Sequence, residues 1–200
     1  MENALEIFDQ SYLDGYLSEY NLCGHERTTM AEMMLAVKAG DEMKLEWFGQ
    51  FGTEVRPILM NSYAFRKGLE FGFEEISFDE YGWLKKPTSL DQEVIEFGRT
   101  DKSRYGNHST VTVGMGPNGV WCYGLSISWG TAGSSSGLSV YNNSFGPKGL
   151  AFGEALSVLK LRMEEKLGDS DTGNYNQKII NATLRDIGKY RVNQVQLSLF

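Results

Sequence analysis

The stretch Val120-Trp121-Cys122-Tyr123-Gly124-Leu125-Ser126-Ile127-Ser128-Trp129 decides the fold class. Large apolar side chains alternate along it with small or polar ones, and this two-residue period is typical of a strand with one buried face. The apolar face would carry Trp121, Tyr123, Leu125, Ile127 and Trp129. We therefore predict a strand whose aromatic side packs on other elements and whose opposite side is small and polar.

The residues on either side of this strand extend it into an antiparallel sheet. Upstream, residues 109–113 are rich in β-branched side chains, and Gly116-Pro117-Asn118-Gly119 is a strong turn sequence that would close a hairpin. Downstream, the glycine- and serine-rich residues 130–137 predict a flexible connection, and residues 138–141 predict a third short strand. The sequence thus indicates an antiparallel β-meander over about residues 109–142.

Two helices are expected after the meander, over residues 150–167 and 175–190. Their apolar side chains recur at three- and four-residue steps, and Gly168 supplies a stop after the first helix. The inward positions would be Phe152, Leu156, Leu159, Met163, Ile180, Leu184 and Ile187. Because these faces need a partner, we expect both helices to pack on the aromatic face of the sheet, which makes the fold class α+β.

The first hundred residues predict a helix-rich region. Apolar spacing favours helices over residues 4–21, 30–39 and 57–67, with a capping box at Thr29 and a stop at Gly40. A five-residue alternation over residues 44–48 predicts a short strand. Strand and irregular structure compete over residues 68–83, and a short helix competes with a strand over residues 90–97. We expect an acidic region at 1–100, the meander with its two helices at 101–192, and a tail at 193–200.

Composition limits the class of protein. The 200 residues carry a net charge of −7 and include 41% hydrophobic side chains, so the chain can bury a core without disulfides or metal. Its start is acidic and lacks the pattern of a secretory signal, and no apolar run is long enough to cross a membrane, so a cytoplasmic protein is expected. Cys23 and Cys122 are then expected to be free thiols.

Charge is distributed unevenly along the chain. Residues 1–100 hold a balance of −10 and residues 101–200 a balance of +3. The first region is therefore expected to be a solvated acidic surface, with a weak mimic of DNA charge as the alternative. In the second region, Lys178, Arg185 and Lys189 recur at helical spacing with Arg191 nearby, and they are candidates for contact with nucleic-acid phosphates. Trp121, Tyr123 and Trp129 could stack on bases, although a core role is the better expectation.

No stretch of the sequence carries a strong catalytic or cofactor motif. The loop at 130–137 lacks the Lys-Ser/Thr pair of a phosphate loop. Cys23-Gly24-His25 places a thiol near an imidazole at a spacing that matches no known dyad, so a structural role is favoured. The acidic pairs Glu74-Glu75 and Asp79-Glu80 are weighed as metal ligands of a nuclease and as a solvated face, and we favour the latter. We expect no metal and no cofactor, and a non-enzyme is favoured.

The last five residues, Gln196-Leu197-Ser198-Leu199-Phe200, resemble the short peptide with which bacterial replication and repair proteins hold the DNA sliding clamp. That motif has the form Gln-Leu-Ser/Asp-Leu-Phe, and all five positions match. At average residue frequencies, the string would occur at this place by chance roughly once in a few hundred thousand sequences. The resemblance covers five residues and recognises no whole-domain family.

This resemblance implies a partner and leaves the activity open. In this family of peptides, an extended segment places its Leu-Phe pair in an apolar pocket of the clamp and its glutamine in a second subsite. We therefore expect an accessory or inhibitory protein of bacterial, phage or plasmid DNA replication or repair. The alternatives are a clamp-localised DNA-processing enzyme with an unidentified active site, and a binding module unrelated to replication whose tail completes the core as a strand.

Overall fold

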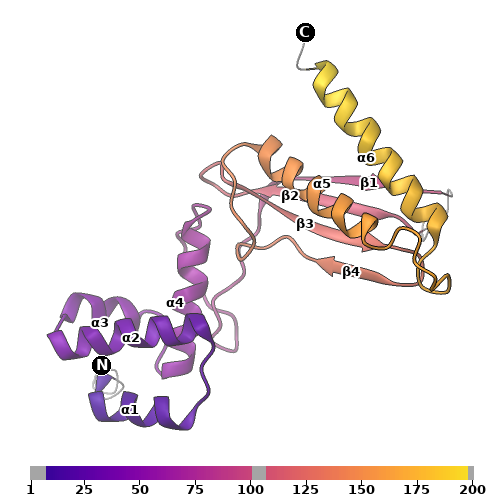
Figure 1. Ribbon diagram of the computed structural model, residues 1–200. Helices are drawn as coiled ribbons and strands as arrows, with labels where there is room; N and C mark the ends of the chain where they lie inside the picture. Colours follow the sequence, from indigo (N-terminus) through magenta and orange to yellow (C-terminus); the bar gives the residue numbers. More distant parts are fainter. Residues whose placement is uncertain (1–7, 101–106, 198–200) are drawn as a thin grey trace. The chain divides into compact units, whose positions relative to one another are not determined.

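The computed structural model describes residues 8–100 and 107–197 and divides the chain into two compact units, residues 1–87 and 88–200 (Figure 1). The division after residue 87 differs from the expected boundary near residue 100. The cause is a strand, β1 (Leu90–Phe97), which pairs with the first strand of the predicted meander and so belongs to the second unit. Side chains are described to residue 193.

The second unit contains the predicted antiparallel sheet. Its strands β1, β2 (Ser109–Met115), β3 (Trp121–Ser128) and β4 (Gly133–Ser136) are adjacent in chain order. The β2–β3 register pairs Val113 with Tyr123 and Val111 with Leu125, which places their side chains on one face. The predicted meander is confirmed. The sheet has a fourth strand, β1, at residues 90–97, for which the sequence allowed either a helix or a strand.

The position of β4 corrects one detail of the prediction. The glycine- and serine-rich stretch forms this edge strand, whereas residues 138–141, predicted as a strand, do not. The backbone of Leu138 instead lies close to Gly124 of β3. A Cβ atom on Gly124 would lie 2.7 Å from the Leu138 nitrogen and 2.8 Å from the Ser136 oxygen, so this close approach requires a glycine.

Two helices cover the aromatic face of the sheet, as predicted. Helix α5 (Lys148–Glu164) lies over β2 and β3, and α6 (Gln177–Leu197) lies along β1 (Figure 1). Their inward side chains join the strands in one core, in which Leu159, Met163 and Ile180 are completely buried. At about 25 cal/mol per Å² of buried apolar surface, this shared core is the main stabilising contribution to the unit.

The first unit consists of helices α1 (Gln10–Glu19), α2 (Gly24–Ala39), α3 (Glu42–Gly49) and α4 (Val55–Leu69). The strand predicted at residues 44–48 is wrong, because these residues lie in α3. The Asp41 carboxylate accepts a hydrogen bond from the Lys44 N–H at 3.1 Å and caps the helix, and Phe48 is buried against α2 and α4. Capping and burial outweigh the alternation of five residues.

Helix α2 begins one and a half turns before the predicted capping box. The Cys23 N–H donates to the Glu26 carboxylate at 2.8 Å, and this hydrogen bond lowers the pKa of Glu26. Thr29 therefore lies inside the helix, where its hydroxyl donates to the His25 carbonyl. Gly40 ends the helix at φ = +62°, as predicted.

Candidate partner-binding segment

Helix α6 changes its environment along its length. Its first turns are fixed by Asn176, whose carboxamide oxygen accepts from the Lys178 N–H at 3.0 Å, and by the buried residues Ile180 and Ile187. Beyond Tyr190, residues 191–193 are exposed, and Val192 keeps 57% of its surface in solvent. Figure 1 shows the end of α6 extending beyond the sheet.

The clamp-like residues follow this exposed part of the helix. We predicted that helical structure ends near residue 190 and that a tail begins at residue 193, but α6 continues to Leu197. Residues 191–197 contain no glycine or proline, so their sequence does not interrupt the i→i−4 hydrogen bonds of the helix. Gln196 and Leu197 thus have a helical backbone, and Ser198, Leu199 and Phe200 lie outside the described residues.

The helical backbone also bears on the alternative in which the tail completes the core as a strand. A strand would need extended backbone from residue 192 onward, and residues 192–197 are helical. The predicted strand is therefore wrong for residues 192–197. The clamp motif itself stays a prediction.

Three of the four candidate phosphate-binding residues share one face of α6. Lys178, Arg185 and Lys189 are all exposed, and their seven- and four-residue spacing aligns them. The Arg185 Nε lies 3.7 Å from the Asp186 carboxylate, which also accepts a hydrogen bond from the Gly98 N–H at 3.0 Å. The stripe is thus partly neutralised, which weakens the case for contact with nucleic acid.

Arg191 does not belong to this face. It is about 200° further round the helix than Lys189, and its guanidinium donates to the Ser157 hydroxyl of α5 at 3.0 Å. There it borders a hollow of about 860 Å³ between α5, α6 and β1, which we call the α5–α6 groove. The expected cluster of four basic side chains is therefore split.

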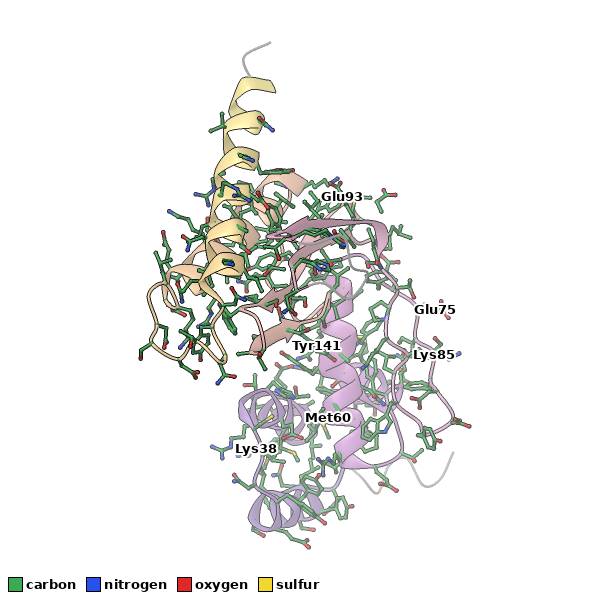
Figure 2. All side chains as sticks on the ribbon, turned by 90° about the vertical axis from the view of Figure 1, so that its right-hand side faces the viewer. Lys38, Met60, Glu75, Lys85, Glu93 and Tyr141 are labelled. Carbon is green, nitrogen blue, oxygen red and sulfur yellow. The ribbon has the colours of Figure 1, made fainter. Side chains whose placement is uncertain are left out.

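The α5–α6 groove combines apolar walls with ion pairs that neutralise one another. Phe152 and Tyr190 form its wall, with ring centroids 4.8 Å apart. Lys148 pairs with Glu93 on β1 and lies over the Trp121 ring, 5.3 Å from its centroid. Glu93 is labelled in Figure 2. The lining residues include neither a nucleophile beside a base nor a set of metal ligands.

The aromatic residues of β3 and the adjacent Trp129 pack on the core and do not form an open stacking surface. Trp121, Tyr123 and Trp129 are half-buried and pack against the cluster formed by the sheet and its helices. The Trp129 indole N–H also donates to the Arg162 carbonyl of α5 at 3.1 Å. The core role that the sequence favoured is confirmed, and base stacking on this face is wrong.

The cysteine and histidine of the first unit lie close together without the alignment of a catalytic pair. The Cys23 Sγ is 3.2 Å from Nδ1 and 3.5 Å from Nε2 of His25. A sulfur nearly equidistant from both nitrogens is not in line with either lone pair, and His25 stacks on Tyr63 at 4.1 Å. Both cysteines are free, as predicted, and burial raises the pKa of the Cys122 thiol.

The paired acids serve a turn or face solvent. Asp79 accepts hydrogen bonds from two N–H groups of its own loop, and Glu74, Glu75 and Glu80 are exposed. Among the described residues, no three His, Cys, Asp or Glu side chains come close enough together to hold a metal ion. Within the same residues, no helix combines the length and apolar character needed to cross a membrane.

Comparison with known proteins adds no relative. No protein-family model, curated protein or solved structure matches this chain. The functional argument therefore depends on the residues alone.

Proposed function

We propose that this protein binds the bacterial DNA sliding clamp through Gln196, Leu197, Ser198, Leu199 and Phe200, and that it is a cytoplasmic accessory or inhibitory protein of DNA replication or repair in a bacterium or a mobile element. The observation that carries the proposal is the five-residue match to the clamp peptide. The acidic first unit favours an inhibitory or protein-binding role over direct DNA binding, because its charge repels phosphates.

The chemistry of the segment supports the proposal. Burying Leu199 and Phe200 in an apolar pocket contributes about 1.5–3 kcal/mol each, and the Gln196 carboxamide adds hydrogen bonds. Ordering the segment offsets part of this gain. The expected affinity of the segment alone is near micromolar, about −8 kcal/mol.

The exposed end of α6 gives the segment room to change conformation. The clamp peptide binds extended, so Gln196 and Leu197 would leave the helix on binding. Residues 191–193 are exposed, and unwinding exposed helical turns requires less free energy than unwinding the buried ones. The folded part of the chain would keep its core while the segment binds.

The test is an affinity measurement between the full chain and a purified bacterial sliding clamp, repeated after deletion of residues 196–200. Binding near micromolar that disappears with the deletion supports the proposal. Val192→Ala is the matched control, because it removes an exposed apolar side chain just outside the segment and should leave the affinity unchanged. Binding that survives the deletion contradicts the proposal.

A further inference from the structure

Three large aromatic side chains lie exposed within six residues of the first unit, in the irregular segment after α4. Phe78, Tyr81 and Trp83 keep 36%, 77% and 42% of their surfaces in solvent. Single exposed apolar residues are common on soluble proteins, whereas several together mark an interaction surface. Tyrosine and tryptophan are also the residues most enriched among those that dominate binding energy.

The loop that carries these aromatics is held in one conformation by its own hydrogen bonds. Residues 77–85 form a small hairpin, closed by a bridge between Phe78 and Leu84 and by the Asp79 N–H bond to the Trp83 carbonyl at 2.9 Å. The Asp79 carboxylate accepts from the Tyr81 and Trp83 N–H groups, each at 2.9 Å. Gly82 takes the positive φ of +81° that the turn requires.

A buried side chain of α4 fixes this hairpin to the helices. Asn61 is only 2% exposed, and its carboxamide makes three hydrogen bonds to backbone groups. The Nδ2 donates to the carbonyls of Phe51 and Gly82 at 2.8 and 2.9 Å, and the Oδ1 accepts from the Leu84 N–H at 2.9 Å. A polar side chain in a core is expensive unless it is fully bonded, so this anchor ensures a single position for the hairpin.

We infer that the hairpin at residues 77–85 is a preformed docking element for a protein whose surface has an apolar pocket bordered by lysine and arginine. The pocket would take Tyr81 and Trp83. The basic border follows from charge complementarity, because Glu74, Glu75, Asp79 and Glu80 outnumber Lys85 and Lys86 around the hairpin. Figure 2 shows Glu75 and Lys85 pointing away from α4 on this segment.

The same charges argue against nucleic acid as the partner. Exposed aromatics can stack on unpaired bases, but proteins that do so place them in a positive groove. Here residues 1–87 carry sixteen acidic and eight basic side chains. Phosphates would be repelled, whereas a basic protein surface would be attracted.

The hydrogen bonds that order the hairpin before binding should increase its affinity for a partner. A loop that is already ordered loses little conformational entropy on binding, so more of the contact energy appears as affinity. This inference does not depend on clamp binding, which the proposal assigns to the other end of the chain.

The test uses a phage-displayed library of random peptides panned against the full chain, with the Tyr81→Ala/Trp83→Ala double variant as counter-selection. The selected peptides are expected to combine aliphatic or aromatic residues with lysine or arginine. Their affinity should fall at least tenfold on the double variant. Tyr12→Ala is the matched control, because Tyr12 is a 52% exposed tyrosine of the same unit and its loss should leave binding unchanged.

Several outcomes overturn the inference. Recovery of no peptide, of peptides without basic residues, or of peptides that bind the double variant equally well removes the basic protein partner. Tighter binding of single-stranded oligonucleotides by the wild type than by the double variant would assign the hairpin to nucleic acid instead. The circular dichroism spectrum of the double variant is expected to match that of the wild type. The hairpin bonds to Asn61 through the Gly82 carbonyl and the Leu84 N–H, and both backbone groups remain in the variant.

Discussion

The two candidate binding elements of this protein are opposites. The hairpin at residues 77–85 is fixed by the buried side chain of Asn61 and by its own turn, but it matches no known sequence motif. The five-residue motif begins at Gln196 in the last turn of α6, and the side chains of residues 191–193 before it are exposed. A motif read by a partner needs a specific sequence and freedom to move, whereas a preformed surface needs an anchor and tolerates varied residues around it.

The largest effect is expected at the motif. Leu199→Ala with Phe200→Ala should weaken clamp binding by at least a hundredfold, because two large side chains worth about 1.5–3 kcal/mol each leave their pocket. Titration of the labelled clamp with the full chain measures this. Unfolding stability should stay the same, and a marked loss of stability would mean that these side chains belong to the core.

For the hairpin, the informative substitution is expected to change the stability of the first unit, whereas the substitutions in the motif are expected to change binding alone. Asn61→Ala leaves two carbonyls and one N–H of the first unit without a partner and should destabilise that unit by about 2–4 kcal/mol. Urea unfolding followed by a probe in the first unit measures the change. Asn181→Ala, followed by a probe in the second unit, is the control, because its exposed carboxamide donates to the Gln177 carbonyl of its own helix and makes no other hydrogen bond among the described residues. Equal effects of the two substitutions would contradict the role of Asn61 as an anchor.

A similar contrast separates two glycines of the second unit. Gly124→Ala places a methyl group 2.7 Å from backbone, so it should destabilise the unit by about 1–3 kcal/mol. In α5, the space around Gly153 is open, so Gly153→Ala should stabilise the unit by about 0.5–1 kcal/mol. Thermal unfolding of the two variants tests both signs, and a loss of stability in both would show that the open space at Gly153 is needed.

The smallest effect sharpens the contrast within α6 itself. Asn193→Gly should change the unfolding free energy by less than about 0.5 kcal/mol, because Asn193 is exposed and lies beyond Ile180 and Ile187, the residues that bury α6. Asn181→Gly lies in the packed part of the same helix and should lose about 0.5–1 kcal/mol. Clamp affinity of Asn193→Gly should stay within about threefold of wild type. A large loss of affinity would mean that the clamp binds the helical form.

Where long periodic patterns exist, the sequence predicts this fold well. The alternation over β3 predicts both the strand and the face that packs on α5 and α6, because ten residues of alternation leave few other solutions. The five residues of α3 show the limit of the method. Their alternation is too short to outweigh the Asp41 cap and the burial of Phe48, both of which depend on the structure around them.

Of the two candidate binding sites, one can be predicted from the sequence and the other cannot. The clamp peptide is a contiguous string and is visible without a structure. The hairpin depends on hydrogen bonds between Asn61 and residues about twenty positions away, and only a structure brings these together. The turn residues Asp79 and Gly82 are the signal that could have indicated it, because Asp at the first and Gly at the fourth position of a four-residue segment are typical of a tight turn.

The anchor at Asn61 also determines how the first unit opens. The Asn61 carboxamide bonds to Phe51, which precedes α4 in the chain, and to Gly82 and Leu84, which follow it. The hairpin therefore cannot detach from α4 without exposing this buried carboxamide to solvent. Hairpin and helix therefore form one cooperative unit for local unfolding. The amide hydrogens of Trp83 and Leu84 should exchange with solvent as slowly as those in the middle of α4, although they lie in a loop beside exposed aromatics.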